Sequence, residues 1–494
     1  MELGDIECRT NVFDTKNEAP QFLSMMRFRE LSILSSLGLL WLLTTSAAFC
    51  QYTFTKVVDT ANTFPGNATT FTSFQEPVVH AGVVAFAGSS ATNGGVFRWT
   101  NSILQKAADF STTPPNGSGK FTFFSGFTVY VENGVVSFRG IGSAGNGIYQ
   151  YDGATLTRLA DTAAPNPAPG GATPFTFLYA PNMKDGLVGF IAETTNFARG
   201  IFLSSNGVMS AKLVPSTGYP GGTGRFALSS QIGLDDGNIA FVGIEDGNNT
   251  RHGIFTLSGG TLTKVAEKNV TTVPGVGGVF TDVQNMPPDV SGTKVAFYGA
   301  YATGNGIFAA NLDGSGLTTL VSTAMAIPGG TGNFTGFTEF EYDNGDLVFG
   351  GSGASAQSGI YLLRNGTLTK ILDKTTSLGG KTISTINFRN ASYANGELAF
   401  GVNFTDATQA IYYTSIGAPV SGGTLGSMQY SAGTGASFSF TGGTVGQPYR
   451  IQYSTNLLLI NWTAITNFTY TSPVIVTNAD APNSPLRFYR AITP

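Results

Sequence analysis

The sequence predicts an all-β fold: a seven-bladed β-propeller closed by an N-terminal strand, followed by a small C-terminal β-sandwich. Three observations support this prediction. A Gly-Ile-Tyr/Phe-like element recurs at steps of 51 to 53 residues, at Gly95, Gly147, Gly200, Gly253, Gly306, Gly359 and Ala410. Each copy belongs to a unit of four short apolar runs, and repeated four-stranded units of this length are typical of propeller blades. The fourth run of the units is shifted along the chain by one place: its first copy lies before the first unit, and no copy follows the last one.

Within a unit, the first strand begins at an aromatic residue or Ile, and the second strand ends in Phe. The first strands begin at Phe71, Phe121, Phe175, Phe226, Phe280, Phe334 and Ile383, and the second strands end at Phe86, Phe138, Phe190, Phe241, Phe297, Phe349 and Phe400. A Gly shortly before each second-strand Phe indicates a turn that needs positive φ. The second strands are nearly all apolar, as expected of strands buried on both faces. We expect their Phe side chains to pack between neighbouring blades.

The third and fourth strands of each unit form a predicted hairpin. The stretch GIYLLRNGTLTKILD, residues 359–373, shows it best, because Asn365-Gly366 separates two runs rich in β-branched and aromatic residues. Asn-Gly is a strong signal for a two-residue hairpin turn.

The fourth strand also predicts how the ring closes. Its copies begin at Phe54, Leu104, Leu156, Met209, Leu262, Leu317 and Leu368, and none follows the last Gly-Ile-Tyr-like element at Ala410. We therefore expect residues 53–59 to form the outer strand of the last blade, beside residues 411–414. This closure pairs the two ends of the sheet array and hides their edges. The propeller is assigned to residues 51–416.

Residues 1–50 are predicted to be a polar leader plus a secretory signal. Two arginines precede an apolar run over residues 31–43, and the small-residue stretch TTSAAFC follows. The run is shorter than the roughly 20 residues that a spanning helix needs. Cleavage after Ala48 or Cys50 would give an extracytoplasmic, secreted chain with no membrane span. A lipidated Cys50 is the alternative, although Phe49 stands where such a signal needs a small residue.

Composition narrows the possible partners. Charged residues make up 11% of the chain, the formal net charge is −4, and no basic run is present, so nucleic acid is not an expected partner. A hydrophobic content of 41% is enough to build a core. The mature chain has at most one cysteine and therefore no internal disulfide, so packing must supply its stability.

The fifth unit, SGTKVAFYGAYATGNGIFAANLDGSGLTTLV, resembles the repeats of TolB-type bacterial propellers. The resemblance covers the second to fourth strands of this unit well and the other units loosely. It implies the blade type, and TolB-like propellers are extracytoplasmic protein-binding modules. It implies no particular partner.

Residues 417–494 leave the repeat and predict a separate β-sandwich module. Strands are expected at 436–441, 449–454, 462–466, 474–476 and 488–492, with turn signals between them. The motifs GQPY, STNL, NWT and RFYR resemble the C-terminal module of secreted Verrucomicrobia-type proteins, which is fibronectin-III-like in build. The resemblance implies an accessory role in attachment or export.

The sequence offers little for catalysis, a cofactor or a metal. It has two histidines, His80 and His252, in different loop classes, and it lacks a nucleophile-elbow or phosphate-binding motif. Inward carboxylates are the exception, because propeller glycosidases use them. The candidates are Glu339, Glu341, Asp343, Asp235 and Asp236, and most lie beside a turn Gly where acidic residues serve the turn. Asp289 and the loop 311–314 allow a calcium site, but a turn is the simpler interpretation.

The loops between second and third strands, and between blades, vary most and should emerge on one face. Binding candidates on this loop face are Phe197, Arg199, Tyr219, Glu245, Asp246, Arg251 and His252. The alternative interpretation is that these residues are solvated loop tips.

Three functional hypotheses follow. The first is a secreted, non-catalytic binding protein, expected to be a monomer, that docks a polysaccharide or a surface protein through the loop face. The second is a secreted carbohydrate-active enzyme with carboxylates in the central channel. The third is a structural exoprotein. The missing catalytic motifs favour the first and third hypotheses over the second.

Overall fold

The computed structural model describes residues 52–492 except 144, 164–172, 196–197, 206, 355, 418–421, 427, 432–434, 444–447, 455–462 and 479–487. The predicted leader and signal, with Cys50, lie outside the described residues. The described part of the chain is built from β-strands and contains no α-helix. Accordingly, no described segment is a helix long and apolar enough to cross a membrane.

Residues 55–415 form seven sheets, which we number in chain order. Sheet 1 holds β2 (Phe71–Phe74), β3 (Val78–His80), β4 (Val83–Ser90), β5 (Gly94–Thr100) and β6 (Ile103–Asp109). Sheet 2 holds β7 (Phe121–Glu132), β8 (Val135–Gly142), β9 (Gly145–Tyr151) and β10 (Leu156–Asp161). Sheet 3 holds β11 (Phe177–Lys184), β12 (Leu187–Glu193), β13 (Arg199–Ser205) and β14 (Val208–Leu213). Sheet 4 holds β15 (Phe226–Asp235), β16 (Asn238–Glu245), β17 (Asn248–Ser258) and β18 (Thr261–Glu267).

The remaining three sheets repeat this antiparallel plan. Sheet 5 holds β19 (Phe280–Asp282), β20 (Asp289–Ser291), β21 (Lys294–Tyr301), β22 (Gly304–Asn311) and β23 (Thr318–Ser322). Sheet 6 holds β24 (Gly336–Asp343), β25 (Asp346–Ser352), β26 (Gly359–Arg364) and β27 (Thr367–Asp373). Sheet 7 holds β28 (Ser377–Leu378), β29 (Lys381–Asn387), β30 (Tyr393–Ala394), β31 (Glu397–Phe404), β32 (Gln409–Ser415) and β1 (Thr55–Asp59).

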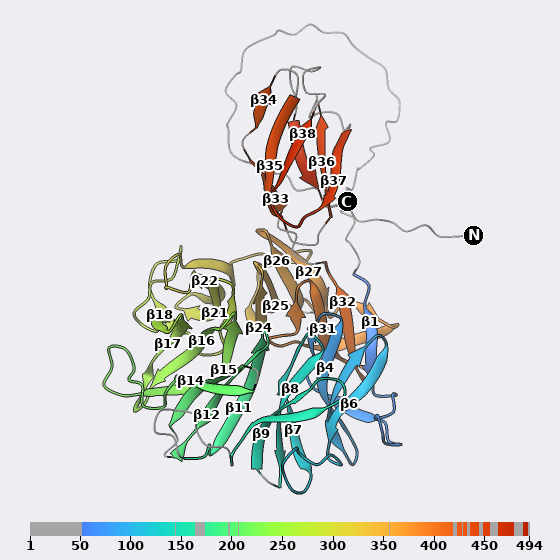
Figure 1. The fold of residues 1–494 in the computed structure, drawn as a ribbon, viewed down its shortest axis with the longest axis vertical. Coiled ribbons are helices and arrows are strands. Elements are labelled where there is room, and N and C mark those ends of the chain that lie inside the picture. Colours follow the sequence, from blue (N-terminus) through green and yellow to red (C-terminus); the bar gives the residue numbers. More distant parts are fainter. Residues whose placement is uncertain are drawn as a thin grey trace, which may run out of the picture. The chain divides into compact units, whose positions relative to one another are not determined.

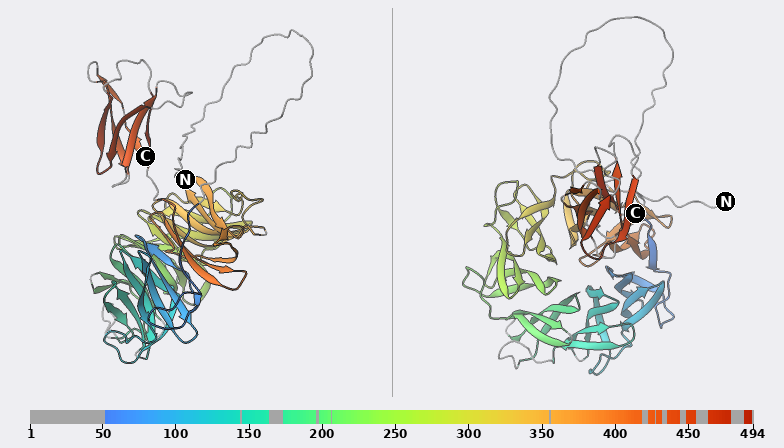
Figure 2. Two further views of the ribbon diagram at one scale, coloured as in Figure 1. Left: turned by 90° about the vertical axis from the view of Figure 1, so that its right-hand side faces the viewer. Right: turned by 45° about the horizontal axis from the view of Figure 1, so that its top comes forward.

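The seven sheets lie around a central axis, as in a β-propeller (Figures 1 and 2). The first strand of each sheet is the innermost one. Contacts between these inner strands run from β3 to β7, β11, β15, β20, β24 and β30, and from β30 back to β3. The inner strands therefore surround a central channel. The outer edge of sheet 7 is β1, whose residues Thr55 and Asp59 pair antiparallel with Tyr413 and Ala410 of β32.

The inner strands are longer than the sequence analysis expected. The aromatic start of each strand, such as Phe121, is visible in the sequence, but β7 continues to Glu132. A bulge divides the strand, because the pairing with β8 shifts between Phe124 and Val129. Similar irregularities interrupt β11, β15 and β24. Bulges re-aim side chains and hide the alternating pattern of a strand, so the second halves were missed.

The core lies between neighbouring sheets. The second-strand Phe side chains, Phe86, Phe138, Phe190, Phe241, Phe297, Phe349 and Phe400, are fully buried. Phe138 of β8 shares its apolar cluster with Ala85 and Val96 of sheet 1, and Phe297 of β21 shares its cluster with Ala240 of sheet 4. In sheets 1 to 6 the second-strand Phe thus packs against the preceding sheet, as expected, with sheet 7 preceding sheet 1.

The tail forms two further sheets. One holds β33 (Gly422–Leu425), β34 (Gln429–Ser431), β35 (Gly435–Gly443) and β38 (Val474–Asn478), and the other holds β36 (Pro448–Ser454), β37 (Thr463–Thr469) and β39 (Phe488–Ile492). Phe438 and Phe440 of the first sheet share one buried cluster with Tyr449 and Ile451 of the second. The two sheets therefore pack on each other. The proposed boundary at residues 416/417 stays a prediction.

Candidate functional site

The inner strand of each sheet ends in a tight turn at one mouth of the channel. The last inner-strand residues are His80, Glu132, Lys184, Asp235, Ser291, Asp343 and Ala394. Two residues separate each from the next strand. In sheet 2 these are Asn133 and Gly134, with φ of 46° and 83°. Positive φ at both positions defines the type I′ hairpin turn, which Asn-Gly favours.

These turns are joined to one another by hydrogen bonds, which we call the turn ring. In each link, a backbone N–H of one turn donates to a side chain of the preceding sheet. The links are Asn133 N to His80 Nδ1 (3.1 Å), Gly186 N to Glu132 Oε2 (2.8 Å), Asp236 N to Asp185 Oδ2 (2.8 Å), Gly292 N to Asp235 Oδ2, Asn344 N to Ser291 Oγ (2.8 Å), Asn395 N to Asp343 Oδ2 (2.7 Å) and Gly82 N to Glu397 Oε2 (3.0 Å). Every neighbouring pair of sheets is linked, including sheet 7 with sheet 1.

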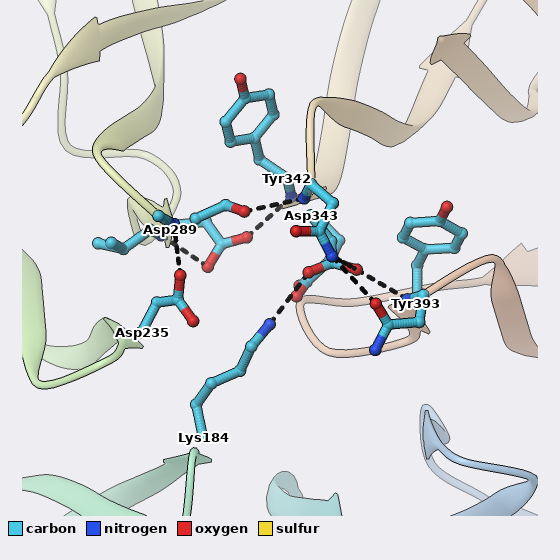
Figure 3. Close-up of polar contacts among 12 residues, drawn as sticks. Lys184, Asp235, Asp289, Tyr342, Asp343 and Tyr393 are labelled. Atoms are coloured by element: carbon cyan, nitrogen blue, oxygen red, sulfur yellow. Dashed lines mark hydrogen bonds and ion pairs between the residues drawn. The ribbon is translucent and has the colours of Figure 1, made fainter. Parts of the chain in front are cut away.

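Further polar contacts join the inner strands beside the turn ring (Figure 3). Lys184 reaches across from sheet 3, and its Nζ lies 3.1 Å from Asp343 Oδ1 of sheet 6. Asp289 Oδ2 accepts a hydrogen bond from the Tyr342 backbone N–H at 2.8 Å. Glu341 accepts one from the backbone N–H of Ala391. The channel carboxylates are therefore used as acceptors between sheets.

Burial dominates the titration of this cluster. Burial raises the pKa of Asp289 to about 7, against opposing hydrogen bonds and the charge of Lys184. Burial likewise raises the pKa of Glu341 well above its usual range. Burial alone would lower the pKa of Lys184, but the charges of Asp343, Glu341 and Asp289 outweigh it and raise that pKa. The cavity beside these groups measures about 30 Å³, which is room for about one water molecule.

Glu339 differs from the other channel carboxylates. It lies in the bulge of β24, half-buried, and no hydrogen-bond partner is found for it among the described residues. Burial raises its pKa to about 7, opposed by the charge of Arg389 and reinforced by that of Glu76. A carboxyl group with such a pKa and no committed partner has the properties of a general acid.

The remaining carboxylate candidates occupy turns. Asp235 and Asp236 belong to the turn ring. The Asp235 carboxylate accepts from the Gly292 N–H, and the Asp236 backbone N–H donates to Asp185. The two parts of the possible calcium site are apart: Asp289 is buried in the channel, whereas Asp313 accepts from Ser315 N at 2.9 Å in an exposed turn.

On the loop face, the structure brings together four of the predicted residues: Arg251, Tyr219, Glu245 and Asp246. Arg251 Nε donates to Glu267 at 2.7 Å, its Nη1 lies 3.7 Å from Glu245, and its guanidinium stacks over the Tyr219 ring at 5.1 Å. Asp246 lies at the rim, paired with Arg225 at 2.9 Å. A hollow of about 520 Å³ opens here, lined by residues 221–224, 245–248 and 251.

The other three candidates lie elsewhere. His252 is fully buried, with Nε2 2.9 Å from Asp282 Oδ1, so it cannot contact a ligand on the surface. Arg199 belongs to sheet 3, where it pairs with Glu193 at 3.2 Å and stacks over Tyr179 at 4.5 Å. Phe197 lies outside the described residues. Tyr219 and Glu245 are also buried, so the exposed part of the hollow is formed mostly by glycines, Thr223, Asp246 and Asn248.

The fold and the channel define this protein as a β-propeller. The chain belongs to a family of unknown function, DUF7453, whose model matches residues 50–419. No match was found among curated proteins.

Solved structures similar to this chain include propeller proteins of several kinds. A puromycin-hydrolyzing peptidase of Mycobacterium tuberculosis has 10% identity and a TM-score of 0.43, with 75% of this chain and 58% of that chain covered. A putative TolB from Agrobacterium tumefaciens has 12% identity and a TM-score of 0.31, covering 51% and 81%. Polysaccharide lyase Uly1 has 10% identity and a TM-score of 0.40, covering 72% and 94%. The chain thus spans 58% of the peptidase, and at these TM-scores the likenesses carry no argument about function.

Proposed function

We propose that this protein is a secreted, non-catalytic binding protein. In this proposal a seven-bladed propeller, closed by the N-terminal strand β1, docks a glycan or a protein through its loop face outside the cytoplasm. The two tail sheets act as a fibronectin-III-like accessory module. The observation that carries the proposal is the use of the channel carboxylates: Glu132, Asp235 and Asp343 all accept backbone hydrogen bonds from the next sheet.

The closed ring is supported by two independent sets of contacts. At the outer edge, β1 pairs with β32 in the last sheet. At the channel, Glu397 of sheet 7 accepts from the Gly82 N–H of sheet 1, which completes the turn ring. The two contacts lie at opposite edges of sheet 7 and join it to residues far away in the chain. A ring held at both edges is a stable platform for loops.

Size also separates the two candidate regions. The cavity of about 30 Å³ among the channel carboxylates is too small for a sugar unit, whereas the hollow on the loop face measures about 520 Å³. Small-molecule sites usually have volumes of roughly 300–1,000 Å³. The loop face is therefore the better candidate for a docking site.

A carbohydrate-active enzyme is the second candidate, and Glu339 is the observation that favours it. Its pKa of about 7 suits proton transfer near neutral pH. A glycosidase usually needs a second carboxyl group at a defined separation. Glu76, whose charge acts on Glu339, is the choice for this second group.

A binding screen with product analysis tests the proposal. The purified protein is applied to a polysaccharide array, and the supernatant is examined for released sugar. Asn248→Trp fills the hollow from an exposed position, and Thr367→Trp is the matched control at an exposed hairpin end. We expect retention without released sugar, weakened by N248W and unchanged by T367W.

Two other outcomes decide against the proposal, and a third moves the docking site. Released sugar that is lost in Glu339→Gln favours the enzyme. Retention that survives N248W places docking elsewhere than in the hollow. A protein that neither binds nor cleaves any array component, and captures no surface protein, is the structural exoprotein of the third hypothesis.

A further inference from the structure

Arg139 has an unusual environment for a propeller arginine. It lies in β8, half-buried, and its guanidinium carbon is 4.7 Å from the centre of the Phe177 ring in the next sheet. Among the described residues, no hydrogen-bond or ion-pair partner is found for this guanidinium. The other arginines within residues 55–415 each have at least one such partner, namely Arg98, Arg158, Arg199, Arg225, Arg251, Arg364 and Arg389. No described residue therefore occupies the five N–H donors of Arg139.

The surroundings of Arg139 leave its charge uncompensated. Burial lowers the pKa of Arg139, and the one opposing influence comes from the Tyr179 hydroxyl rather than from a carboxylate. The nearest acidic group in this part of sheet 3 is Glu193, which is already occupied. Its Oε2 accepts from Tyr179 Oη at 3.0 Å and from Arg199 Nε at 3.2 Å. One positive charge therefore remains at the wall formed by Phe177 and Tyr179.

The position of this wall is on the loop side of sheet 3. Phe177 pairs with Glu193, and Glu193 pairs with Arg199, so the three residues lie side by side across β11, β12 and β13. They flank the loop between β12 and β13, which the sequence analysis placed on the docking face. Phe177 and Tyr179 contact each other edge to face at 4.8 Å. Each ring contacts one guanidinium group: Phe177 contacts that of Arg139, and Tyr179 contacts that of Arg199 at 4.5 Å.

We propose that Arg139, supported by Phe177, Tyr179 and Arg199, binds the acidic group of a polysaccharide, a uronate carboxylate or a sulfate ester. This inference rests on the proposed docking function and names its ligand class. A guanidinium fork matches such planar or tetrahedral oxyanions with two parallel hydrogen bonds. The Phe177 ring holds the Arg139 guanidinium in place before the ligand arrives, which lowers the entropy cost of binding.

Charge density favours a polysaccharide over other polyanions. The chain has a net charge of −4 and only 11% charged residues, so a densely charged nucleic acid would meet repulsion and few cations. A single uncompensated arginine beside the Phe177 and Tyr179 rings suits a ligand with widely spaced anions.

Affinity electrophoresis of the purified protein tests this inference. The gels contain polygalacturonate for the uronate source, dextran sulfate for the sulfate source, or neutral dextran. Arg139→Met keeps the packing on Phe177 and removes the charge, while Lys120→Gln removes one exposed charge elsewhere and is the control. We expect retardation by at least one acidic polymer, weakened on the order of tenfold or more in Kd by R139M and unchanged by K120Q.

The outcomes separate this inference from the proposed function. Retardation by acidic polymers that R139M leaves unchanged would overturn the Arg139 subsite and leave docking intact. Retardation by neutral dextran alone would do the same. Failure of the wild-type protein to bind any glycan, here or on the array, would overturn this inference, and it would overturn the proposed function only if the protein also captured no surface protein. Thermal melts of R139M and K120Q establish that both variants are folded, and Arg139→Lys, which keeps the charge without the fork, should recover only part of the binding.

Discussion

Replacing Asp343 by alanine tests the structural role of the channel carboxylates. Asp343 is only 2% exposed, accepts from the Asn395 backbone N–H at 2.7 Å, and lies 3.1 Å from Lys184 Nζ. Breaking a buried ion pair by removing one partner costs about 3–5 kcal/mol. Because the Lys184 side chain is 25% exposed, water relieves part of that cost. We therefore expect the free energy of unfolding to fall by about 3 kcal/mol, which includes the loss of the Asn395 hydrogen bond.

The assay is urea unfolding followed by fluorescence, with a matched control. Asp313→Ala removes a carboxylate from an exposed turn and should cost less than about 1 kcal/mol. Lys184→Met in the Asp343→Ala background removes the stranded charge, so the double variant should be more stable than the sum of the single changes by about 1–3 kcal/mol. A loss below about 1 kcal/mol for D343A, or additive effects, would refute the interpretation that these carboxylates hold the sheets together.

Three further predictions concern pH, the tail and export. The pKa of Asp289 is raised to about 7 in the folded protein. Between about pH 4 and 7 the folded state therefore binds a proton at Asp289 that the unfolded state lacks. The stability of the protein should rise as pH falls from 8 to 5, and Asp289→Asn should flatten this trend in thermal melts. A chain of residues 51–416 should unfold cooperatively in the same assay; loss of cooperativity would show that the tail belongs to the core. N-terminal sequencing of exported protein should find a start near Phe49 or Gln51, whereas an acylated Cys50 would contradict the soluble form.

Much of the fold could be predicted because it repeats. Seven copies of each strand signal, with a fourth strand displaced to the N-terminus, indicated both the sheet plan and the pairing of residues 53–59 with the last sheet. The inner strands were the exception. Prolines interrupt the alternating pattern there and favour an interpretation as loop, as do Pro77, between β2 and β3, and Pro181, just after the irregularity in β11.

The candidate site was harder to predict, because its chemistry depends on contacts between units. The acidic residues before turn glycines suggested a turn role, but a carboxylate such as Glu132 serves the turn of the next sheet, more than 50 residues away. Of the residues two places before a turn Gly, only His80, Glu132, Asp235 and Asp343 are acceptors in the turn ring, so their spacing alone did not reveal it. Arg139 gave no such signal, since only the folded arrangement shows that no described residue pairs with its guanidinium. Burial of Tyr219, Glu245 and His252 likewise depended on packing between loops.

The claim on which the rest depends is that the chain closes into one ring through β1, and moving β1 tests it most directly. One variant lacks Tyr52 to Thr60, and a second carries the same segment after Ser415 through a short turn, which suits the antiparallel pairing with β32. Thermal melts of both are compared with the parent. We predict that the deletion abolishes or strongly lowers the cooperative transition, because it exposes the edge of β32 and Ile411, and that relocation restores a native-like transition. A deletion variant that melts like the parent would show that β1 does not close the ring.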